Sequence, residues 1–397
     1  MRLAVLLLLP ALSCLAQDFS QRGFFETWFI GYPQTAPSDR SHAVAEGLFR
    51  YEAFYSPDSA WRFSAGIDAR TDTHLQDERS WGLSWWDRET RRPAFEVRRL
   101  SALYNHGPLT IELGKQFVRW GKADILNPTD RFAPRDFLTV VDYDFLAITA
   151  ARITYERGGD TLDAIWAPRF TPSRIPLLNQ RWAAVPAGVR ILDGGAQYPG
   201  GSQAGLRWNH TGAGYEFSLS FYNGFNTLPE FRNQLVSGPS PAVSVTRIYP
   251  RLRMYGGDAA VPMRVFTLKG EAAYFGDYTM YVVQAERPVR EWMFVGGYAG
   301  QISRGAAAAP QFEPDRGLTR AFLGRATYTI DTGRSLLFEA ALRRNGEGVW
   351  LKSEYSQTFG QHWRATAGFT LIRGARNDFL GQYRDNSHAV LVLRYSF

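Results

Sequence analysis

The alternation that decides the fold is plainest in the stretch Trp61-Arg62-Phe63-Ser64-Ala65-Gly66-Ile67-Asp68-Ala69-Arg70. Every second residue from Trp61 to Ala69 is apolar, the residues between them are Arg, Ser, Gly and Asp, and Arg70 follows. Because successive side chains of a β-strand point to opposite faces, this order gives a strand with one apolar and one polar face. A strand of about ten residues with this pattern can cross a membrane within a closed barrel.

The same alternation recurs along the whole chain, for example over residues 204–209, 215–221 and 363–371. It predicts an all-β fold, a single transmembrane antiparallel β-barrel of about eighteen strands, with sixteen as the smaller even number. The predicted strands are residues 22–33, 42–55, 61–71, 95–106, 109–118, 148–157, 160–168, 202–211, 213–224, 246–261, 264–276, 278–287, 291–303, 317–330, 335–345, 347–359, 362–373 and 386–397.

The links between the predicted strands alternate in length. Short turns fall at residues 106–108, 158–159, 212, 261–262 and 331–333, and longer links at 72–94, 119–147, 169–201, 225–245 and 374–385. Short links near residues 277 and 346 break this trend. Outer-membrane barrels have short periplasmic turns and long external loops, so we expect the two kinds of link at opposite ends of the barrel.

The first sixteen residues have the pattern of a secretory signal. Arg2 supplies the positive charge, residues 3–9 the apolar segment, and Cys14-Leu15-Ala16 the small-x-small pattern before cleavage between Ala16 and Gln17. A span would need about 20 apolar residues, so this segment is too short for an anchor. A lipoprotein signal with acylated Cys14 is the alternative, although the residues before it fit poorly. We expect residues 17–397 to form the barrel in the outer membrane.

The C-terminal strand provides a second signal. Leu391, Leu393, Tyr395 and Phe397 alternate on one face, and the chain ends on the phenylalanine. This segment resembles the terminal strand of outer-membrane proteins. The resemblance implies that these four residues are the signal read by the barrel-insertion machinery.

Composition excludes several classes of protein. The chain has a formal charge of +7, 15% aromatic residues and a single cysteine, Cys14. The mature chain would have no cysteine, which excludes disulfides and cysteine–metal ligation. The charges are dispersed rather than in blocks, and no glycine-rich phosphate loop or metal-ligand cluster is present. We therefore expect no nucleic acid, metal or cofactor as a partner.

If the apolar faces contact lipid, the polar faces line the lumen. A barrel of sixteen to eighteen strands is too wide for side chains to fill, and no separate plug domain precedes the strands, so we expect an aqueous channel. Ion pairs that only stabilise the wall are the alternative role for these charges. The predicted pore-lining residues are Arg62, Arg70, Arg98, Arg207, Arg251, Arg253 and Glu271.

Residues 119–147 form the most distinctive link, where alternation stops and basic and acidic residues follow one another. A long loop early in a porin folds inward and narrows the pore, and its charges set selectivity. A surface loop packed on its neighbours is the alternative. The predicted constriction residues are Arg119, Lys122, Asp124, Asp130, Arg131, Arg135 and Asp136.

Several short motifs resemble those of porin-like families of unassigned substrate, related in style to alginate-export and substrate-specific porins. They are Gly114-Lys115-Gln116, Trp120-Gly121, Asn127-Pro128-x-Asp130, Tyr249-Pro250-Arg251 to Gly256, and Gly270-Glu271-Ala272-Ala273-Tyr274. The likeness covers about a third of the chain. The resemblance implies an outer-membrane channel, but it does not imply a particular substrate.

Three functions follow from these observations. We favour passive diffusion of small hydrophilic solutes through the pore, with a preference for anions if the arginine-rich lining dominates. A non-conducting barrel (a receptor, an adhesin or a transporter of hydrophobic ligands) is the alternative, suggested by apolar residues 175–178 and Trp182 in a long link. A hydrolase is less favoured, because the six histidines are scattered and lie in no hydrolase motif. We expect the aromatic strand faces to contact outer-membrane lipid and lipopolysaccharide, and they would also suit a homo-oligomer interface.

Overall fold

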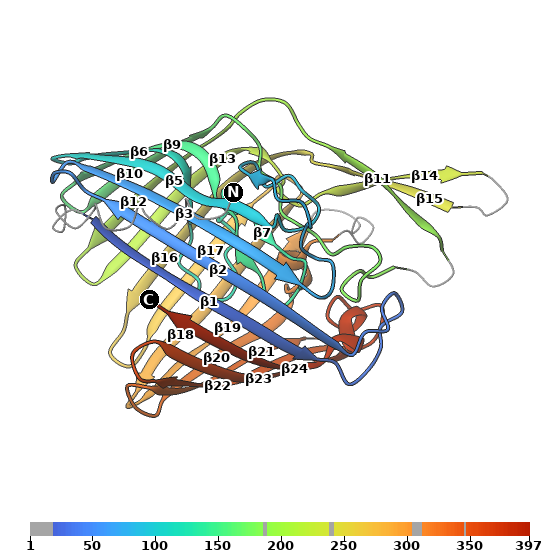
Figure 1. The fold of residues 1–397 in the computed structure, drawn as a ribbon. Helices are drawn as coiled ribbons and strands as arrows, with labels where there is room; N and C mark the ends of the chain where they lie inside the picture. Colours follow the sequence, from blue (N-terminus) through green and yellow to red (C-terminus); the bar gives the residue numbers. More distant parts are fainter. Residues whose placement is uncertain (1–18, 186–188, 238–241, 304–311, 345–346) are drawn as a thin grey trace, which may run out of the picture.

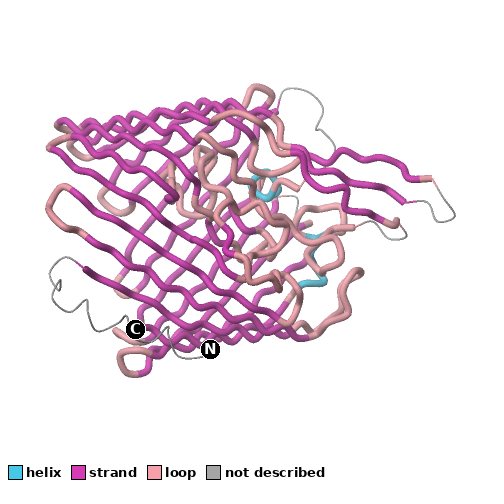
Figure 2. The backbone as a smooth tube through the Cα atoms, turned by 45° about the horizontal axis from the view of Figure 1, so that its top comes forward, coloured by secondary structure: helices cyan, strands magenta, loops and turns pink. Residues whose placement is uncertain are grey.

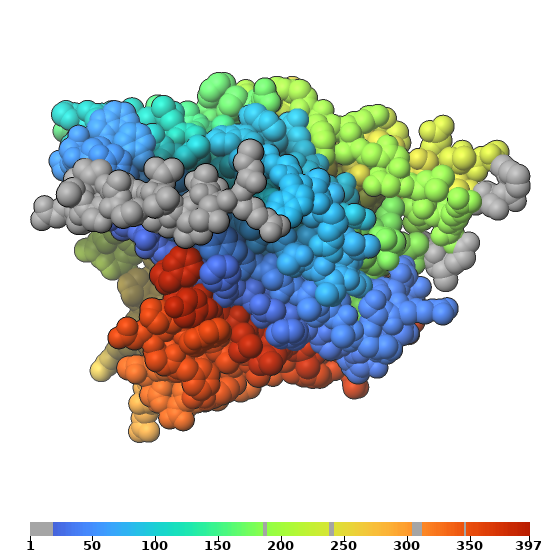
Figure 3. Space-filling view, in the orientation of Figure 1, coloured from blue at the N-terminus to red at the C-terminus, as the bar shows by residue number. Residues whose placement is uncertain are grey.

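The computed structural model describes residues 19–185, 189–237, 242–303, 312–344 and 347–397. Over these residues eighteen antiparallel strands form a closed barrel, as the sequence predicts. Each wall strand pairs with the next one along the chain, and β1 (Phe19–Gly31) closes the barrel against β24 (His388–Ser396). The first and last strands accordingly lie side by side in Figure 1 and on the surface in Figure 3. The predicted signal segment, residues 1–16, lies outside the described residues.

All eighteen predicted strands are present, with ends that differ by at most five residues from those expected. The wall strands between β1 and β24 are β2 (Ala43–Tyr55), β3 (Trp61–Asp72), β5 (Phe95–His106), β6 (Leu109–Gln116), β9 (Ile148–Arg157), β10 (Asp160–Ala167), β12 (Gln203–Gly212), β13 (Tyr215–Phe225), β16 (Arg251–Pro262), β17 (Thr267–Tyr274), β18 (Tyr278–Val289), β19 (Trp292–Ser303), β20 (Ala321–Thr329), β21 (Arg334–Arg343), β22 (Gly348–Phe359) and β23 (Trp363–Gly374).

Alternation along each wall strand separates an apolar outer face from an inner face. In β3, Trp61 and Ile67 point outward and are 41% and 45% exposed, whereas Asp68, the residue after Ile67, points inward and is 2% exposed. Outward-facing aromatic residues gather near both ends of the barrel, as in the girdles at the two membrane interfaces of outer-membrane barrels. In the described ranges, no helix is long and apolar enough to cross a membrane.

Most short links lie at one end of the barrel, and the long links all lie at the other end, together with the two short links after β17 and β21. At one end the turns are as short as Gly107-Pro108 and Gly158-Gly159, where Gly107 and Gly158 have φ of +57° and +62°. At the other end the long links contain small elements: β4 (Leu83–Ser84), β7 (Arg135–Asp136), β8 (Asp144–Phe145), α1 (Pro314–Gly317) and the 3₁₀ helix η1 (Gly381–Asn386). We call these the turn side and the loop side.

A small sheet projects from the loop side, and we call it the flap. It has the order β11-β15-β14, formed by β11 (Ile191–Gln197), β15 (Ala242–Ile248) and β14 (Glu230–Val236). Its strands come from the links before β12 and before β16, and Figure 1 shows it extending beyond the wall strands on the right. The sequence predicts the segment before Arg251 as part of a wall strand, and this detail is wrong, because Tyr249-Pro250 separates the flap from β16.

The lumen on the loop side is packed with chain, as Figure 2 shows. Inward-facing apolar residues of the wall, such as Ile165, Met254 and Met280, are buried against residues 117–147. The inner face of the wall is therefore polar in some places, as we expect, and apolar where the loop covers it. Where a loop covers the wall from inside, both faces of a strand become apolar, for the same reason as in sheets that are buried on both sides.

Candidate constriction site

The link between β6 and β9, residues 117–147, runs through the barrel interior, and we call it the constriction loop. It contacts the wall at strands far apart around the barrel. Trp120 Nε1 donates to Asp163 of β10 at 3.1 Å, and the main-chain N–H of Asp124 donates to Gln284 of β18 at 2.9 Å. Further along, Asp142 reaches Lys352 of β22 at 2.7 Å. The loop therefore lies across the lumen rather than on the outer surface.

Glu271 of β17 is the main wall contact of this loop. Its carboxylate accepts hydrogen bonds from the backbone N–H groups of Lys122, Ala123 and Thr129 at 3.0, 3.1 and 2.8 Å, and from Thr129 Oγ1 at 2.8 Å. Gly121 lies against the same carboxylate with φ of +95°, where a Cβ would come within 2.7 Å of Oε1. A glycine is thus required both by the backbone conformation and by the close approach.

Most of the predicted constriction residues hold the loop in place instead of facing open lumen. Asp130 has no exposed side-chain surface and pairs with Arg119 at 2.8 Å. Both Arg131 and Arg135 pair with Asp315 of α1, at 3.2 and 2.8 Å. Burial raises the pKa of Asp130, although Arg135, the Trp120 N–H, Arg119 and Arg131 favour its charged form.

Two other predicted residues join the loop to the wall, and one joins it to other loops. Asp124 pairs with Lys269 of β17 at 3.0 Å, and Lys122 with Glu216 of β13 at 2.6 Å. Asp136 pairs with Arg92 and Arg174, which belong to two other loop-side links, at 2.9 and 3.3 Å. Of the seven predicted side chains, only Arg119 is close to half exposed, at 47%.

Residues 142–145 of the constriction loop, which we call the loop tip, present two carboxylates that are not among the predicted constriction residues, Asp142 and Asp144. Their side chains are 46% and 43% exposed, respectively. Asp144 faces three arginines of the wall: Arg98 at 2.9 Å, Arg50 at 3.2 Å and Arg70 at 3.8 Å. Burial opposes ionisation of Asp144, but Arg98, Arg50 and Arg70 outweigh it and hold its pKa well below the usual range.

The surroundings of the tip carry more positive than negative charge. Arg50, Arg70 and Arg98 share Asp68 of β3 as well as Asp144. Two further arginines stack on loop phenylalanines: Arg119 lies 3.6 Å from the ring centre of Phe145, and Arg99 lies 5.7 Å from that of Phe117. The members of this arginine cluster are Arg50, Arg70, Arg98, Arg99 and Arg119, and the carboxylates paired with it are Asp68, Asp130 and Asp144.

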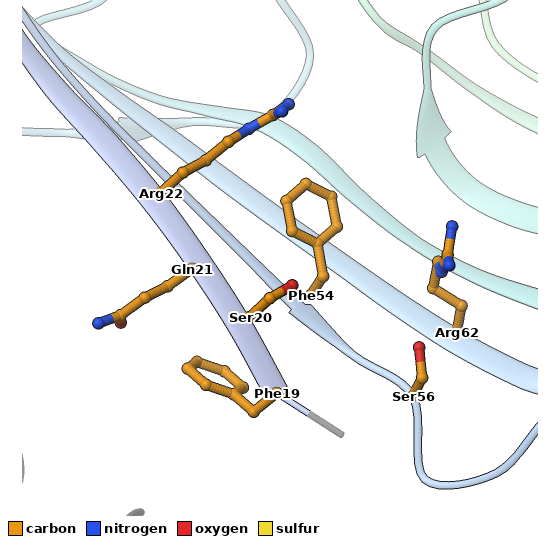
Figure 4. Close-up of a pocket in the computed structure, with 7 residues that line it drawn as sticks. All are labelled: Phe19, Ser20, Gln21, Arg22, Phe54, Ser56 and Arg62. Atoms are coloured by element: carbon orange, nitrogen blue, oxygen red, sulfur yellow. The ribbon is translucent and has the colours of Figure 1, made fainter. Parts of the chain in front are cut away.

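Four of the predicted pore-lining residues point into the barrel or line a cavity at its rim. Arg70 and Arg98 belong to the arginine cluster, while Arg207 points inward but is bound to Asp258 at 2.9 Å with 11% of its side chain exposed. Arg62 lies at the turn side, in a cavity of about 470 Å³. Figure 4 shows Arg62, Arg22 and Phe54 on one side of the sheet there, with Gln21 on the other.

Three residues do not line the pore as predicted. Glu271 points inward but is only 3% exposed, because the constriction loop covers it. Arg251 and Arg253 lie on the outer face of β16 with Tyr255, which is 52% exposed, whereas Met254 points inward and has no exposed surface. The prediction fails because the inward residues of β16 are apolar where they meet the loop, so polar residues do not mark the lumen in this strand.

The predicted assembly residues Leu391, Leu393, Tyr395 and Phe397 lie on the outer face of the last strand and at its end. Phe397 exchanges two backbone hydrogen bonds with Gly23, at 2.9 and 3.0 Å, and its ring lies 5.9 Å from that of Phe25. The C-terminal residue thereby takes part in closing the barrel. That the barrel-insertion machinery recognises these four residues stays a prediction.

The groups at the constriction contact one another by ion pairing and stacking. No cluster of three or more His, Cys, Asp or Glu side chains that could hold a metal ion occurs among the described residues. With arginines, carboxylates and phenylalanines beside an inward loop, the site can attract, orient and pass charged solutes.

Comparison with known proteins identifies the fold class. No family model and no curated protein matches the sequence. The solved structure of OccAB4 from Acinetobacter baumannii aligns with 96% of this chain and 98% of its own, with a TM-score of 0.57 and 8% sequence identity. Variants of the porin of Rhodopseudomonas blastica align with 96% of this chain and 100% of their own, with a TM-score of 0.45 and 9% identity.

The chain therefore has the fold of an outer-membrane, porin-like β-barrel, as its sequence motifs suggest. At such low identity this likeness concerns the fold alone. The resemblance to porin-like barrels is confirmed at that level.

Proposed function

We propose that this barrel is an outer-membrane channel for the passive diffusion of small hydrophilic solutes, with a preference for anions. The solute's concentration gradient supplies the driving force, and the protein supplies a wet path with charged walls. Eighteen strands enclose more space than wall side chains can fill. The constriction loop narrows that space on the loop side.

The observation that carries the anion preference is the excess of guanidinium groups at the loop tip. Five arginines face Asp68, Asp130 and Asp144 there, and Asp142, the other carboxylate of the loop tip, is paired with Lys352. The local field is therefore positive, and a charged constriction favours the oppositely charged solute. Arginine also presents several donors in a plane, which suits carboxylate and phosphate groups.

The same geometry gives no support to hydrolysis. A serine or aspartate site needs a base within hydrogen-bond reach of a nucleophile and a third group that orients the base. His388 is buried and bonded to the carbonyl of Asn386 at 2.9 Å, and His210 bonds Asp160 on the outer face at 2.8 Å. A channel without chemistry is the function that the porin-like fold favours.

Liposome swelling tests this proposal with solutes of similar size and opposite charge. Proteoliposomes would be diluted into isotonic sodium gluconate or glucosamine hydrochloride, and the swelling rates compared with those of empty vesicles. We expect swelling with both solutes and a faster rate with gluconate. No swelling at high protein load would favour a receptor or adhesin barrel, and faster swelling with glucosamine would contradict the anion preference.

A further inference from the structure

A second site lies outside the constriction, where the flap meets two loop-side links. It is a cavity of about 360 Å³ between the flap, residues 175–179, and Glu78, Thr90 and Arg91 of the link 73–94. We call it the flap pocket. Its volume falls in the range of pockets that hold small molecules, about 300–1,000 Å³.

The floor of the flap pocket is aliphatic. Ile175, Leu177 and Leu178 form it from one side, and the first two are only 8% and 7% exposed. Ile191 of β11 and Val245 of β15 face them from the flap. Two separate segments of chain thus present apolar side chains to the same space, which favours a ligand with an apolar body.

An ion pair closes one side of the pocket. Arg247 of β15 binds both oxygens of Asp193 in β11, at 2.9 and 3.0 Å. The same guanidinium donates to Thr90 Oγ1 at 3.3 Å. Arg247 therefore ties the flap to the link 73–94 and holds the two walls of the pocket at a fixed separation.

Two charged side chains of opposite sign remain at the rim, Glu78 and Arg91. They lie on neighbouring segments, because the N–H of Glu78 donates to the carbonyl of Arg92 at 2.7 Å. Both are half-buried and line the pocket. Within the part of the chain that the structure describes, neither side chain has a hydrogen-bond or ion-pair partner. Both charges therefore remain available to a ligand that carries a complementary ammonium group and carboxylate.

We propose that the flap pocket binds a small zwitterion with an aliphatic body, of the class of an aliphatic dipeptide. The apolar floor takes the side chains, Arg91 takes the carboxylate and Glu78 takes the ammonium group. Binding here precedes any passage through the barrel and does not depend on whether the barrel conducts. The pocket would raise the local concentration of such a solute on the loop side.

Isothermal titration calorimetry of the purified full-length protein with leucyl-leucine tests the proposal. We expect saturable binding of the dipeptide, and binding at least tenfold weaker for glycyl-glycine, which lacks the aliphatic body, and for N-acetyl-leucyl-leucine amide, which lacks both charges. Arg91→Ala and Glu78→Ala should each weaken binding about tenfold, and Ile191→Asp should abolish it. Arg264→Ala on a turn-side link and Leu235→Asp on the exposed edge strand β14 are matched controls that should bind normally.

Several results would overturn the assignment. Absence of saturable heat with leucyl-leucine would show that the pocket does not take this class. Equal affinity for the uncharged analogue would remove the roles of Glu78 and Arg91. If Ile191→Asp kept full affinity while retaining the barrel's resistance to unfolding in detergent gels, the ligand would bind elsewhere. Since channel activity is not the readout, failure here leaves the swelling experiment unaffected.

Discussion

Glu271 in the wall and Thr129 in the constriction loop are joined twice: Oε1 of the glutamate accepts both the backbone N–H and the Oγ1–H of Thr129, each at 2.8 Å. Its other oxygen accepts the N–H groups of Lys122 and Ala123. A single buried carboxylate thereby fixes two turns of the loop. The position of the loop across the lumen depends on this one wall residue more than on any exposed charge.

Glu271→Gln should loosen the constriction loop. The amide keeps one acceptor oxygen and places an NH₂ group against backbone donors, so we expect a loss of about 2 kcal/mol in the free energy that holds the loop. Hydrogen exchange of residues 117–131 should become faster, and single-channel currents noisier. Glu339→Gln is the matched control, since Glu339 points inward but pairs with Arg325 of the neighbouring strand at 2.6 Å. Equal effects from both variants would refute a specific anchoring role.

Neutralising the arginine cluster should weaken anion preference. Arg98→Gln removes the closest partner of Asp144, so the reversal potential in a salt gradient should move toward the cation side. Asp144→Asn should move it the opposite way. Arg253→Gln is the control, because this arginine lies on the outer face of β16 and should leave selectivity unchanged. A shift with Arg253→Gln as large as that with Arg98→Gln would place the selective charges elsewhere.

Asp77 in the loop-side link 73–94 has an unusual environment. Burial raises its pKa to about 7; Asp72 and Glu46 add to the rise, while Arg92 and Arg70 oppose it. Its Oδ1 is buried without a hydrogen-bond partner among the described residues. When the link 73–94 is docked on the barrel, Asp77 keeps its proton up to a pH of about 7. When the link is undocked and Asp77 is exposed to water, it releases the proton near the ordinary pKa of aspartate.

Docking of this link should weaken as pH rises. Between the ordinary pKa of aspartate and about 7, the docked form binds more protons than the open form, so its stability is full at low pH and falls as pH increases to about 7. After correction for intrinsic exchange, residues 73–94 should exchange faster at pH 7 than at pH 5, by at most about tenfold per pH unit. Asp77→Asn should remove this dependence, whereas Asp58→Asn on the turn side should keep it. A flat profile in the unmodified protein would contradict the raised pKa.

Phe397→Ala should lower the yield of folded barrel in the outer membrane. Two causes are separable, because the ring both packs on Phe25 and ends the chain. Phe25→Ala removes the same ring contact and leaves the terminal residue intact. If insertion depends on the terminal aromatic, Phe397→Ala should reduce heat-modifiable barrel severalfold more than Phe25→Ala. Equal losses would indicate packing alone.

The strands could be predicted because period-two alternation is a local property of the sequence. The inner face of a strand contacts segments that are distant in the sequence. The strand's own sequence therefore does not show whether that face meets water or a loop, and the predicted pore-lining residues of β16 are wrong for this reason. In β16, Leu252 and Met254 point inward onto the loop, which leaves Arg251 and Arg253 on the outer face. The double-sided apolar run in β18, with Met280 and Val282 inward, was a usable sign that something covers the wall from inside.

The sequence predicts which segment forms the constriction loop, but it does not predict the role of each charged residue in that loop. Its charges were visible, yet which of them pair depends on partners as distant as Asp315 and Lys352. Asp142 and Asp144 stand apart from the dense basic and acidic run and are the more exposed carboxylates. Their exposure follows from the path of the loop across the barrel, which no local pattern encodes.

The most direct test of the channel and its anion preference is the zero-current potential of single channels in a planar bilayer, measured across a tenfold potassium chloride gradient. We expect stable conductance steps and a reversal potential of the sign given by chloride preference. The magnitude of this potential should fall at higher salt, because the salt screens the arginine cluster. A complete absence of steps at high protein load, or a potential of the cation-selective sign, would contradict the proposed anion-preferring channel.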